Sequence, residues 1–553
     1  MKQRLIAISI IFFVALLTAN AQRGRNTFAV GDSEFLLNRQ PFQIISGELH
    51  PARIPAEYWR HRIQMAKAMG CNTITIPVFW NYHEEAEGVF DFETGNRNLA
   101  EFFRLAQQEQ MWVIVKSNPH VGADWEFGGL PPYLLRTSDI ELRSADTRYM
   151  AAVERYITRL SNVLRPHLIT QGGTILMLQI ENRYDNLLKA NGIDIPTTST
   201  LETGIVNVNT GGATYWGNEW IKGDATRLLN EVKSLMDSQK SFNLQVIHGG
   251  TNFGYTAGAK SDEKGYQPNI TSYDNDALIT EQGVPTETYM ALRDIIGSYL
   301  QRRQSLSSIP RAVTAVDILA IHLMPFNSVW NLLSAPINSE RPQPFEYYGQ
   351  DYGFMVYRTE LTEQKSGKLT ITELHDYATV FLNGNYIGKI DRRLGENSIE
   401  LPDTEAENTV LEIFVEAMGR ISSDQPLADR KGITEKVTLN DITLTNWQVY
   451  NAPMDRKTIY DLRSSGRNLD KPGIIFKGSF MFLESGDTYI DLSNYEKGVV
   501  WINGHNLGRY WNIGPQTRLF CPASWLRRGL NEIIIFDLHQ TTAQPVFGFK
   551  TLE

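Results

Sequence analysis

The sequence has few of the features that would mark a disulfide-stapled, nucleic-acid-binding or metal-dependent protein. Only two of its 553 residues are cysteines, Cys71 and Cys521, which excludes the disulfide framework of small secreted domains. The net charge is −9, and there is no Lys/Arg run of the kind that follows a phosphate backbone, so we expect no nucleic-acid partner. The ten histidines show no H-E-x-x-H pairing, and neither a P-loop nor a dinucleotide fingerprint occurs. We therefore predict no metal and no cofactor.

A long membrane-spanning apolar run is also missing. The apolar stretch Leu5–Leu17 is shorter than the roughly 20 residues that cross a bilayer. It follows the basic residues Lys2 and Arg4 and ends before Ala19-Asn20-Ala21, a small-x-small cleavage pattern. This pattern predicts a signal peptide over residues 1–21, with no integral membrane span after its cleavage. Export without a disulfide framework favours the periplasm or cell surface of a bacterium.

What is present is the composition of an ordinary globular protein, with 42% hydrophobic and 21% charged residues. At roughly 100–200 residues per domain, the length predicts about three domains.

In the first part of the chain, short apolar runs alternate with amphipathic stretches. The clearest predicted strands are 72–79, 112–116, 174–180 and 244–248, and the clearest helices are 56–69, 98–109, 147–164 and 225–238. Alternation of this kind is typical of a parallel sheet, and its length favours an α/β fold of the (β/α)8 TIM-barrel type over residues 27–303. Polar residues that directly follow the strands are then expected at the carboxyl rim, where barrel enzymes keep their chemistry.

After about residue 303 the helix pattern ends. A Ser/Pro/Gln-rich segment predicts a linker over 304–345, and short strands with intervening turns follow it. We expect two all-β sandwich or jelly-roll domains, 346–455 and 456–553.

The expected rim carries aromatic, amide and acidic side chains, a mixture that suits sugars because their rings offer apolar faces and hydroxyl edges. Trp80 follows the second strand, where it would either bind a sugar or pack in the barrel lip. Asp124 lies in a Gly-rich loop after the third strand and is favoured over Glu126 as a contact residue. Charged residues beside the first strand, in the segment 46–55, are expected to form ion pairs at the mouth.

Taken together, these segments resemble glycoside hydrolase family 35, the β-galactosidase family, over nearly the whole mature chain and in the same order. The matching segments are His50…Arg53…Pro55…Trp59, Trp80-Asn81-x-His83-Glu84, Ala123-Asp124-Trp125, Gln179-Ile180-Glu181-Asn182, Gly249-Gly250-Thr251-Asn252-Phe253-Gly254, Thr271-Ser272-Tyr273-Asp274 and Trp501-Ile502-Asn503-Gly504. The resemblance implies a retaining hydrolase of terminal β-galactosides, with one Glu as acid/base and another as nucleophile. It also implies that the domain 456–553 is a galactose-binding-like β-sandwich.

The sequence departs from the family at both catalytic positions. The acid/base position holds Arg183, which stays protonated and cannot alternate between donating and accepting a proton. The best fit for the nucleophile is Glu219, at the end of an expected strand, although another register places Thr214 there. The stretch from Tyr184 to Glu219 is also shorter than the family's, which predicts a contracted barrel.

The resemblance further implies that Asn182, Asp124, Tyr273, Trp80 and Gln245 contact the sugar, although Gln245 replaces a family tyrosine. Three hypotheses remain open at this point. The chain is a glycosidase with altered substrate choice, a carbohydrate-binding homologue without activity, or an adhesion protein that uses only its β domains.

Overall fold

The computed structural model describes the chain from residue 26 to residue 553, except for 32–33, 199–203, 275, 301–304 and 424–427. The predicted signal peptide, 1–21, lies outside the described residues. In the part that is described, no helix is both long and apolar enough to cross a membrane.

The first module is built on a parallel sheet of seven strands, which confirms the predicted barrel type. The strand order is β10-β9-β8-β5-β4-β12-β11, and every neighbouring pair is parallel. The strands are β4 (Ile45–Leu49), β5 (Thr73–Pro77), β8 (Trp112–Lys116), β9 (Ile175–Gln179), β10 (Thr197–Thr198), β11 (Val206–Asn209) and β12 (Phe242–His248).

The expected contraction lies between β10 and β11, which do not pair with each other. Only residues 199–205 separate them in sequence. A parallel crossover needs a dozen residues or more, so this connection is too short for a helix and a further strand. Among the described residues the barrel sheet therefore has seven strands and is open on this side.

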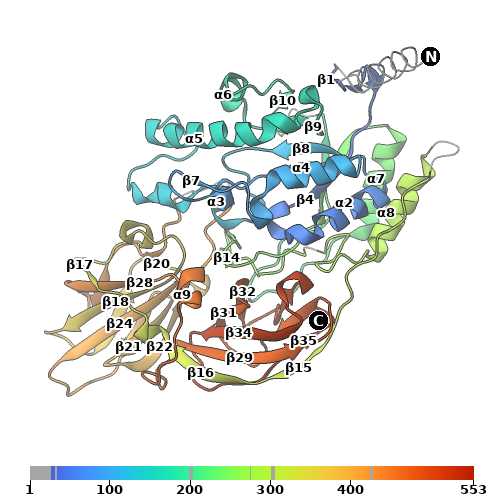
Figure 1. Ribbon diagram of the computed structural model, residues 1–553. Coiled ribbons are helices and arrows are strands. Elements are labelled where there is room, and N and C mark those ends of the chain that lie inside the picture. Colours follow the sequence, from blue (N-terminus) through green and yellow to red (C-terminus); the bar gives the residue numbers. More distant parts are fainter. Residues whose placement is uncertain (1–25, 32–33, 199–203, 275, 301–304, 424–427) are drawn as a thin grey trace, which may run out of the picture.

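Amphipathic helices cover the outside of the sheet (Figure 1). They are α2 (Trp59–Met69), α4 (Leu99–Gln108), α5 (Thr147–Leu164), α7 (Ala225–Asp237) and α8 (Glu287–Ser298), and the shorter α3 (Trp80–His83) and α6 (Asp185–Ala190) follow β5 and β9. Side chains cap several N-termini: Asn98 caps α4, Asp146 caps α5 and Asp224 caps α7. The four helices predicted from periodicity are all present, with ends that differ by up to three residues.

The amino-terminal strands close one end of the barrel. β1 (Phe28–Val30), β2 (Phe35–Leu37) and β3 (Gln40–Pro41) form a small antiparallel sheet. Phe35 packs with Ile44, Ile114, Met177 and Ile205 in a separate apolar cluster. This cluster fills the interior at that end, which leaves the carboxyl ends of the strands as the open end.

Two antiparallel sandwiches follow, as predicted. The first pairs a sheet of β17 (Ile337–Ser339), β28 (Trp447–Ala452), β18 (Gly353–Leu361), β24 (Thr409–Ala417), β21 (Tyr377–Leu382) and β22 (Asn385–Asp391) with a sheet of β23 (Ser398–Leu401), β19 (Gly367–Ile371), β26 (Val437–Leu439) and β27 (Ile442–Thr443). The second pairs β16 (Leu323–Ser328), β29 (Ile474–Phe482), β34 (Gly529–Asp537), β31 (Lys497–Ile502) and β32 (His505–Trp511) with β15 (Ile318–Ile321), β35 (Val546–Phe549), β30 (Thr488–Asp491) and β33 (Arg518–Cys521).

The segment 304–345, expected to be a linker, instead supplies strands to both sandwiches. β15 pairs with β35, β16 pairs with β29, and β17 pairs with β28. The first sandwich is therefore inserted between two strands of the second. Each of these strands is short and has a single partner at a sheet edge, and buried and exposed side chains do not alternate along β15 or β16, so the sequence carries no two-residue apolar period there.

The two sandwiches pack against each other through aromatic and aliphatic side chains. Phe354 and Phe414 of the first meet Phe536 of the second, and the rings of Phe354 and Phe536 lie 4.8 Å apart. Trp216 and Tyr266 of the barrel module belong to the same cluster. All three modules therefore share one apolar core.

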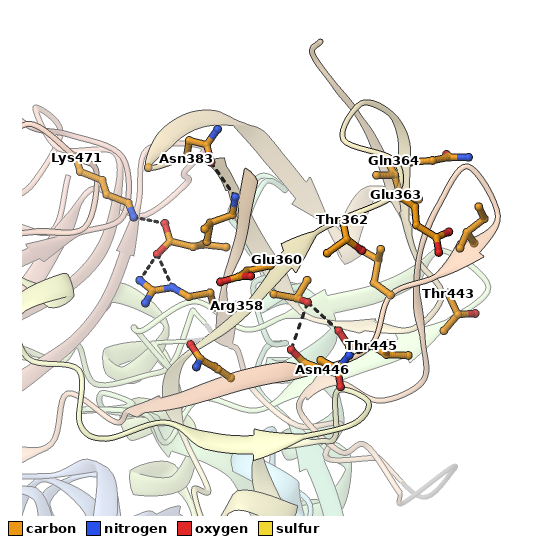
Figure 2. A pocket seen from close by; sticks show the side chains of 18 of the residues that line it. Arg358, Glu360, Thr362, Glu363, Gln364, Asn383, Thr443, Thr445, Asn446 and Lys471 are labelled. Carbon is orange, nitrogen blue, oxygen red and sulfur yellow. Dashed lines mark hydrogen bonds and ion pairs between the residues drawn. The ribbon is translucent and has the colours of Figure 1, made fainter. Parts of the chain in front are cut away.

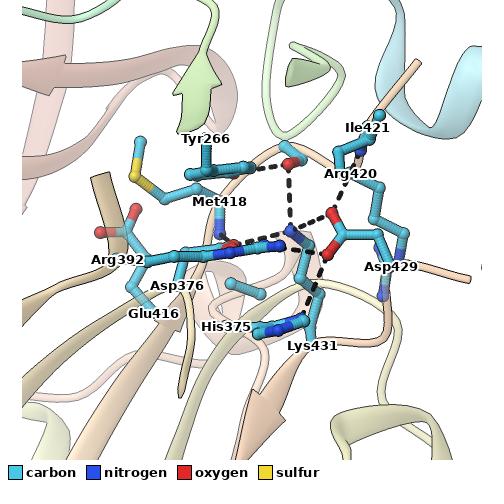
Figure 3. A network of polar contacts seen from close by, with 12 residues as sticks. Tyr266, His375, Asp376, Arg392, Glu416, Met418, Arg420, Ile421, Asp429 and Lys431 are labelled. Atoms are coloured by element: carbon cyan, nitrogen blue, oxygen red, sulfur yellow. Dashed lines mark hydrogen bonds and ion pairs between the residues drawn. The ribbon is translucent and has the colours of Figure 1, made fainter. Parts of the chain in front are cut away.

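A buried ion network lies where the first sandwich meets the barrel loops (Figure 3). The Lys431 ammonium contacts Asp376 Oδ2 at 2.7 Å and Asp429 Oδ2 at 2.9 Å, and Arg392 contacts the other oxygen of each carboxylate. The Tyr266 hydroxyl, from the hairpin of β13 (Ala259–Asp262) and β14 (Gly265–Pro268), donates to the Gly419 carbonyl.

Beside this network, Arg420 bridges the first sandwich to the barrel. Its guanidinium, 1% exposed, pairs with Glu346 of the sandwich and with Glu126 of the loop after β8. The Arg420 backbone N–H also donates to Glu126 Oε2 at 2.7 Å. Arg420 thus fixes the loop that carries Asp124 and Trp125.

Replacing Arg420 by Met should destabilise the protein by about 3–5 kcal/mol, because Glu346 would be left buried without its partner. Chemical unfolding of the full chain, followed by fluorescence and by circular dichroism, measures the change. Arg104→Met is the control: Arg104 pairs with Glu101 on the exposed surface of α4, where a pair contributes about 0–1 kcal/mol. Equal destabilisation by the two substitutions would contradict the bridging role.

Candidate functional site at the barrel mouth

A layer of polar side chains crosses the barrel interior and joins the carboxyl ends of β4 and β8 to the first residues of β12 and β11. Glu48 of β4 accepts hydrogen bonds through Oε2 from Lys116 of β8 at 2.6 Å and from Asn243 of β12 at 2.9 Å. Asn243 also donates to Asn207 of β11 at 3.1 Å. Side chains alternate along a strand, and Ser46 and Ile44, which lie two and four residues before Glu48, face inward as well. The layer therefore ties together strands from different parts of the barrel.

Glu48 is fully buried and ionised. Burial opposes its charge, but Lys116 and His50 overcome this and lower its pKa to about 2. The His50 ring contacts Glu48 Oε1 through Nε2 at 3.1 Å and the Arg53 guanidinium through Nδ1 at 2.6 Å. Since the guanidinium can only donate, Nδ1 accepts and Nε2 carries the proton. Burial lowers the pKa of His50 to about 4, so the ring is neutral at pH 7. Of the ion pairs expected at this strand end, the structure shows one, between Glu48 and Lys116 of β8, whereas the neutral His50 is hydrogen-bonded to Glu48.

Arg53 is the centre of the cluster. It is fully buried, donates from Nε to Asn252 Oδ1 at 2.7 Å and from NH2 to the Ala123 carbonyl at 2.9 Å. Its guanidinium also lies 3.6 Å from the ring centroid of Tyr273, a cation–π contact. Burial lowers the pKa of Arg53 to about 10, which still leaves it charged at neutral pH. Arg53 therefore joins three loops of the mouth.

Asp124 and Tyr273 stand together beside Arg53. The Tyr273 hydroxyl donates to Asp124 Oδ2 at 3.0 Å. Burial raises the pKa of the Asp124 carboxyl above its ordinary value, although Arg53 and Tyr273 oppose the rise. Asp124 is partly exposed as a residue whereas Tyr273 is 5% exposed, so Asp124 lies nearer to the solvent than its partner. The structure thus brings two of the predicted contact residues together.

Two glycines allow this close arrangement. A Cβ on Gly249 would meet the Tyr273 carbonyl oxygen at 1.5 Å, and one on Gly250 would meet the Arg53 carbonyl oxygen at 2.5 Å. The exit loop of β12 can approach Arg53 and Tyr273 only because these positions lack side chains. This explains the Gly249-Gly250 pair seen in the sequence.

Residues 181–183 follow β9 at the same edge of the sheet. The Arg183 Nε lies 2.9 Å from Glu181 Oε2, and its NH1 donates to the Arg143 carbonyl at 2.8 Å. Arg143 also pairs with Glu181 at 3.5 Å. Glu181 is thus neutralised by arginines, and Asn182 and Arg183 are exposed.

The remaining predicted site residues lie in different surroundings. Glu219 is exposed in an irregular loop, and the strand expected to end there is absent, because the strand in this part of the chain is β11. The loop contacts the sandwich modules instead: the Gly217 N–H donates to the Gly514 carbonyl at 2.7 Å. Gln245 is half-buried on β12. Trp80 is fully buried and stacks on Tyr156 at 4.9 Å, so it packs in the barrel lip rather than facing a ligand.

Sequence reasoning missed the inward role of Lys116 and Asn243. Both sit at strand positions that a two-residue periodicity places inside, but an isolated polar residue in a strand does not reveal its partner across the barrel. Within the described residues, no group of three or more His, Cys, Asp or Glu side chains is placed to hold a metal ion.

A cavity of about 740 Å³ lies away from the mouth, on the first sandwich (Figure 2). Polar side chains line it, including Thr445 and Asn446. Arg358 and Lys471 both pair with Glu412 at 2.5 Å, and the exposed Glu360 and Glu363 also lie on the lining.

The loop beneath the mouth contains a buried carboxyl that should make stability depend on pH. Glu281 accepts a hydrogen bond from Thr251 Oγ1 at 2.7 Å, and burial, with Asp274 nearby, raises its pKa to about 8 from 4.5. The folded protein therefore holds a proton that the unfolded chain releases above pH 4.5. This contribution to stability is complete below pH 4.5 and is lost as the pH rises to about 8.

We expect Glu281→Gln to flatten the fall in the free energy of unfolding between pH 5 and pH 8. Urea titrations across this range measure the slope, and Glu263→Gln, at an exposed position, is the control. An unchanged slope in Glu281→Gln would show that the carboxyl is not protonated in the folded protein.

Comparisons with known proteins agree with this architecture. Residues 34–209 and 203–299 match the family model of glycosyl hydrolases family 35, 342–453 match the first all-beta domain of beta-galactosidase, and 474–531 match its galactose-binding domain. A beta-galactosidase of Xanthomonas manihotis is 33% identical, covering 91% of this chain and 92% of its own. Human beta-galactosidase-1-like protein 2 is 33% identical, covering 93% and 90%, and Arabidopsis thaliana beta-galactosidase 17 is 30% identical, covering 92% and 87%. These matches support a glycosidase, and the chain belongs to glycoside hydrolase family 35.

Proposed function

We propose that this family member hydrolyses terminal β-glycosides of oligo- or polysaccharides, and that the sugar binds at the Asp124–Tyr273 edge of the barrel mouth. The observation that carries this proposal is the preformed cluster around Arg53, which holds Asp124, a partly exposed residue, in a fixed position at the mouth. A carboxylate accepts hydrogen bonds from sugar hydroxyls, and neighbouring rings supply apolar surface.

The proposed reaction proceeds with retention, with Glu219 as the nucleophile. Retention requires two carboxyl groups about 5–5.5 Å apart, one of which protonates the leaving oxygen. Arg183 cannot supply that proton, because a guanidinium stays protonated at neutral pH. We therefore propose that activity is restricted to substrates whose leaving groups need little protonation.

A second candidate function is carbohydrate binding without turnover. It is favoured by the ion pairing of Arg183 with Glu181 and by the exposed position of Glu219 in a loop that contacts the sandwich modules. In this alternative the mouth cluster holds a sugar but no residue cleaves it.

Kinetics with aryl β-galactosides of graded leaving-group acidity test the first proposal. The unmodified protein should hydrolyse a dinitrophenyl glycoside, and Glu219→Gln should abolish the activity. Arg183→Glu should raise the rate on substrates with poor leaving groups by about 10²–10⁴-fold, because general acid catalysis contributes this much.

Lys189→Glu, a charge reversal at an exposed site on α6, is the control for Arg183→Glu and should leave the rates unchanged. No turnover of any aryl glycoside, together with galactose binding in calorimetry, would replace hydrolysis by the second candidate function. Turnover that survives Glu219→Gln would exclude Glu219 as the nucleophile.

We also propose that the protein is exported to the periplasm or the cell surface of a bacterium. The proposal is supported by the basic, apolar and small-x-small order of residues 1–21. Amino-terminal sequencing of the protein from a membrane-enclosed fraction should give a chain that begins at Gln22. A chain that retains Met1 would contradict cleavage.

A further inference from the structure

A cavity of about 390 Å³ lies where the barrel meets both sandwiches. Its lining comes from the loops after β5, β8 and β12, from residues 351–352 of the first sandwich, from the connecting residues 454–456 and from the β31–β32 turn of the second sandwich. Small-ligand sites typically occupy about 300–1,000 Å³ and often lie between domains. The cavity thus has the size and the location of a ligand site.

Aromatic rings form its walls. The rings of Tyr255 and Tyr352 stack with centroids 5.0 Å apart, and Tyr352 is 41% exposed. Phe253 and His505 also line the cavity, and both rings pack on Trp525, at 4.5 Å and 4.7 Å. Rings contributed by different modules therefore offer flat apolar surfaces to one enclosed space.

The carboxylates on the lining already have partners within the protein. Glu126 pairs with Arg420, Glu85 with Arg97, and Asp351 with Arg136 at 3.1 Å. Glu84 accepts hydrogen bonds from Trp80 and Gly88, and Asp455 accepts one from the Thr458 N–H. A cationic ligand would have to compete with these partners, and an anionic one would face the carboxylates, so the cavity favours a neutral ligand.

We propose that this cavity binds hexose units of a neutral β-linked oligosaccharide, as a second carbohydrate site beside the barrel mouth. Sugar rings stack their C–H faces on aromatic side chains, and their hydroxyls hydrogen-bond to polar groups such as Thr256 and Asn506, which lie on the lining. Trp125 lines the cavity and directly follows Asp124, so the second site adjoins the mouth. Binding here does not require that the barrel cleave its ligand.

Isothermal calorimetry of the full chain with an S-linked β-1,4-galactotriose tests the proposal, because the sulfur bridges resist hydrolysis. Tyr352→Ala should weaken binding by roughly fivefold or more, since it removes an exposed stacking surface. Tyr347→Ala is the matched control. Tyr347 lies five residues before Tyr352 in the sequence, is 66% exposed and is not part of the cavity lining. The Tyr347→Ala variant should bind the galactotriose with the same affinity as the unmodified protein.

The Asp124→Asn variant distinguishes binding at the barrel mouth from binding in the cavity. Binding that is lost in Asp124→Asn but unchanged in Tyr352→Ala would place the sugar only at the mouth and overturn the proposal. Absence of binding to the galactotriose, S-linked mannotriose and S-linked cellotriose would overturn it as well, as would binding of trigalacturonic acid alone. Weakened binding in Tyr352→Ala together with an absence of aryl glycosidase activity would support the second site and count only against hydrolysis.

Discussion

The buried guanidinium of Arg53 is the constraint on which the barrel mouth depends. It joins the loop after β4 to the loop of Asn252 and to the Ala123 carbonyl, and its charge faces the Tyr273 ring. A buried charge is tolerated only when its hydrogen bonds are satisfied. The loops therefore have to meet at Arg53, and Asp124 is placed as a result.

The sandwich modules also help to fix the loops of the barrel mouth. Arg420 clamps Glu126, two residues after Asp124, and the shared apolar core joins the barrel hairpin to both sandwiches. Since the first sandwich is inserted into the second, neither can separate from the barrel by motion of a single linker. The position of the Asp124 loop is thus set by all three modules.

Much of the fold and part of the mouth cluster could be predicted from the sequence. The helices followed from their apolar periodicity, and an ion pair of Glu48 followed from charges placed at a strand end, although its partner Lys116 lies on another strand. The strands within 304–345 could not be predicted, because they are short and their buried and exposed side chains do not alternate with a two-residue period. The burial of Trp80 could not be predicted either, because an aromatic residue after a barrel strand is equally typical of a sugar-stacking surface and of side-chain packing at the barrel lip. The open barrel was indicated only by the short spacing between Tyr184 and Glu219. This spacing predicts that a segment is missing, but it does not predict which two neighbouring strands remain unpaired.

We propose that the cluster around Arg53 at the barrel mouth binds a sugar at Asp124, whether or not the sugar is then hydrolysed. A crystal structure of the protein soaked with galactose tests this most directly. The account predicts a pyranose with a hydroxyl within hydrogen-bonding distance of the Asp124 carboxylate, and Arg53, His50 and Tyr273 unmoved. A sugar-free mouth at saturating galactose, or a galactose bound only elsewhere on the chain, would contradict it.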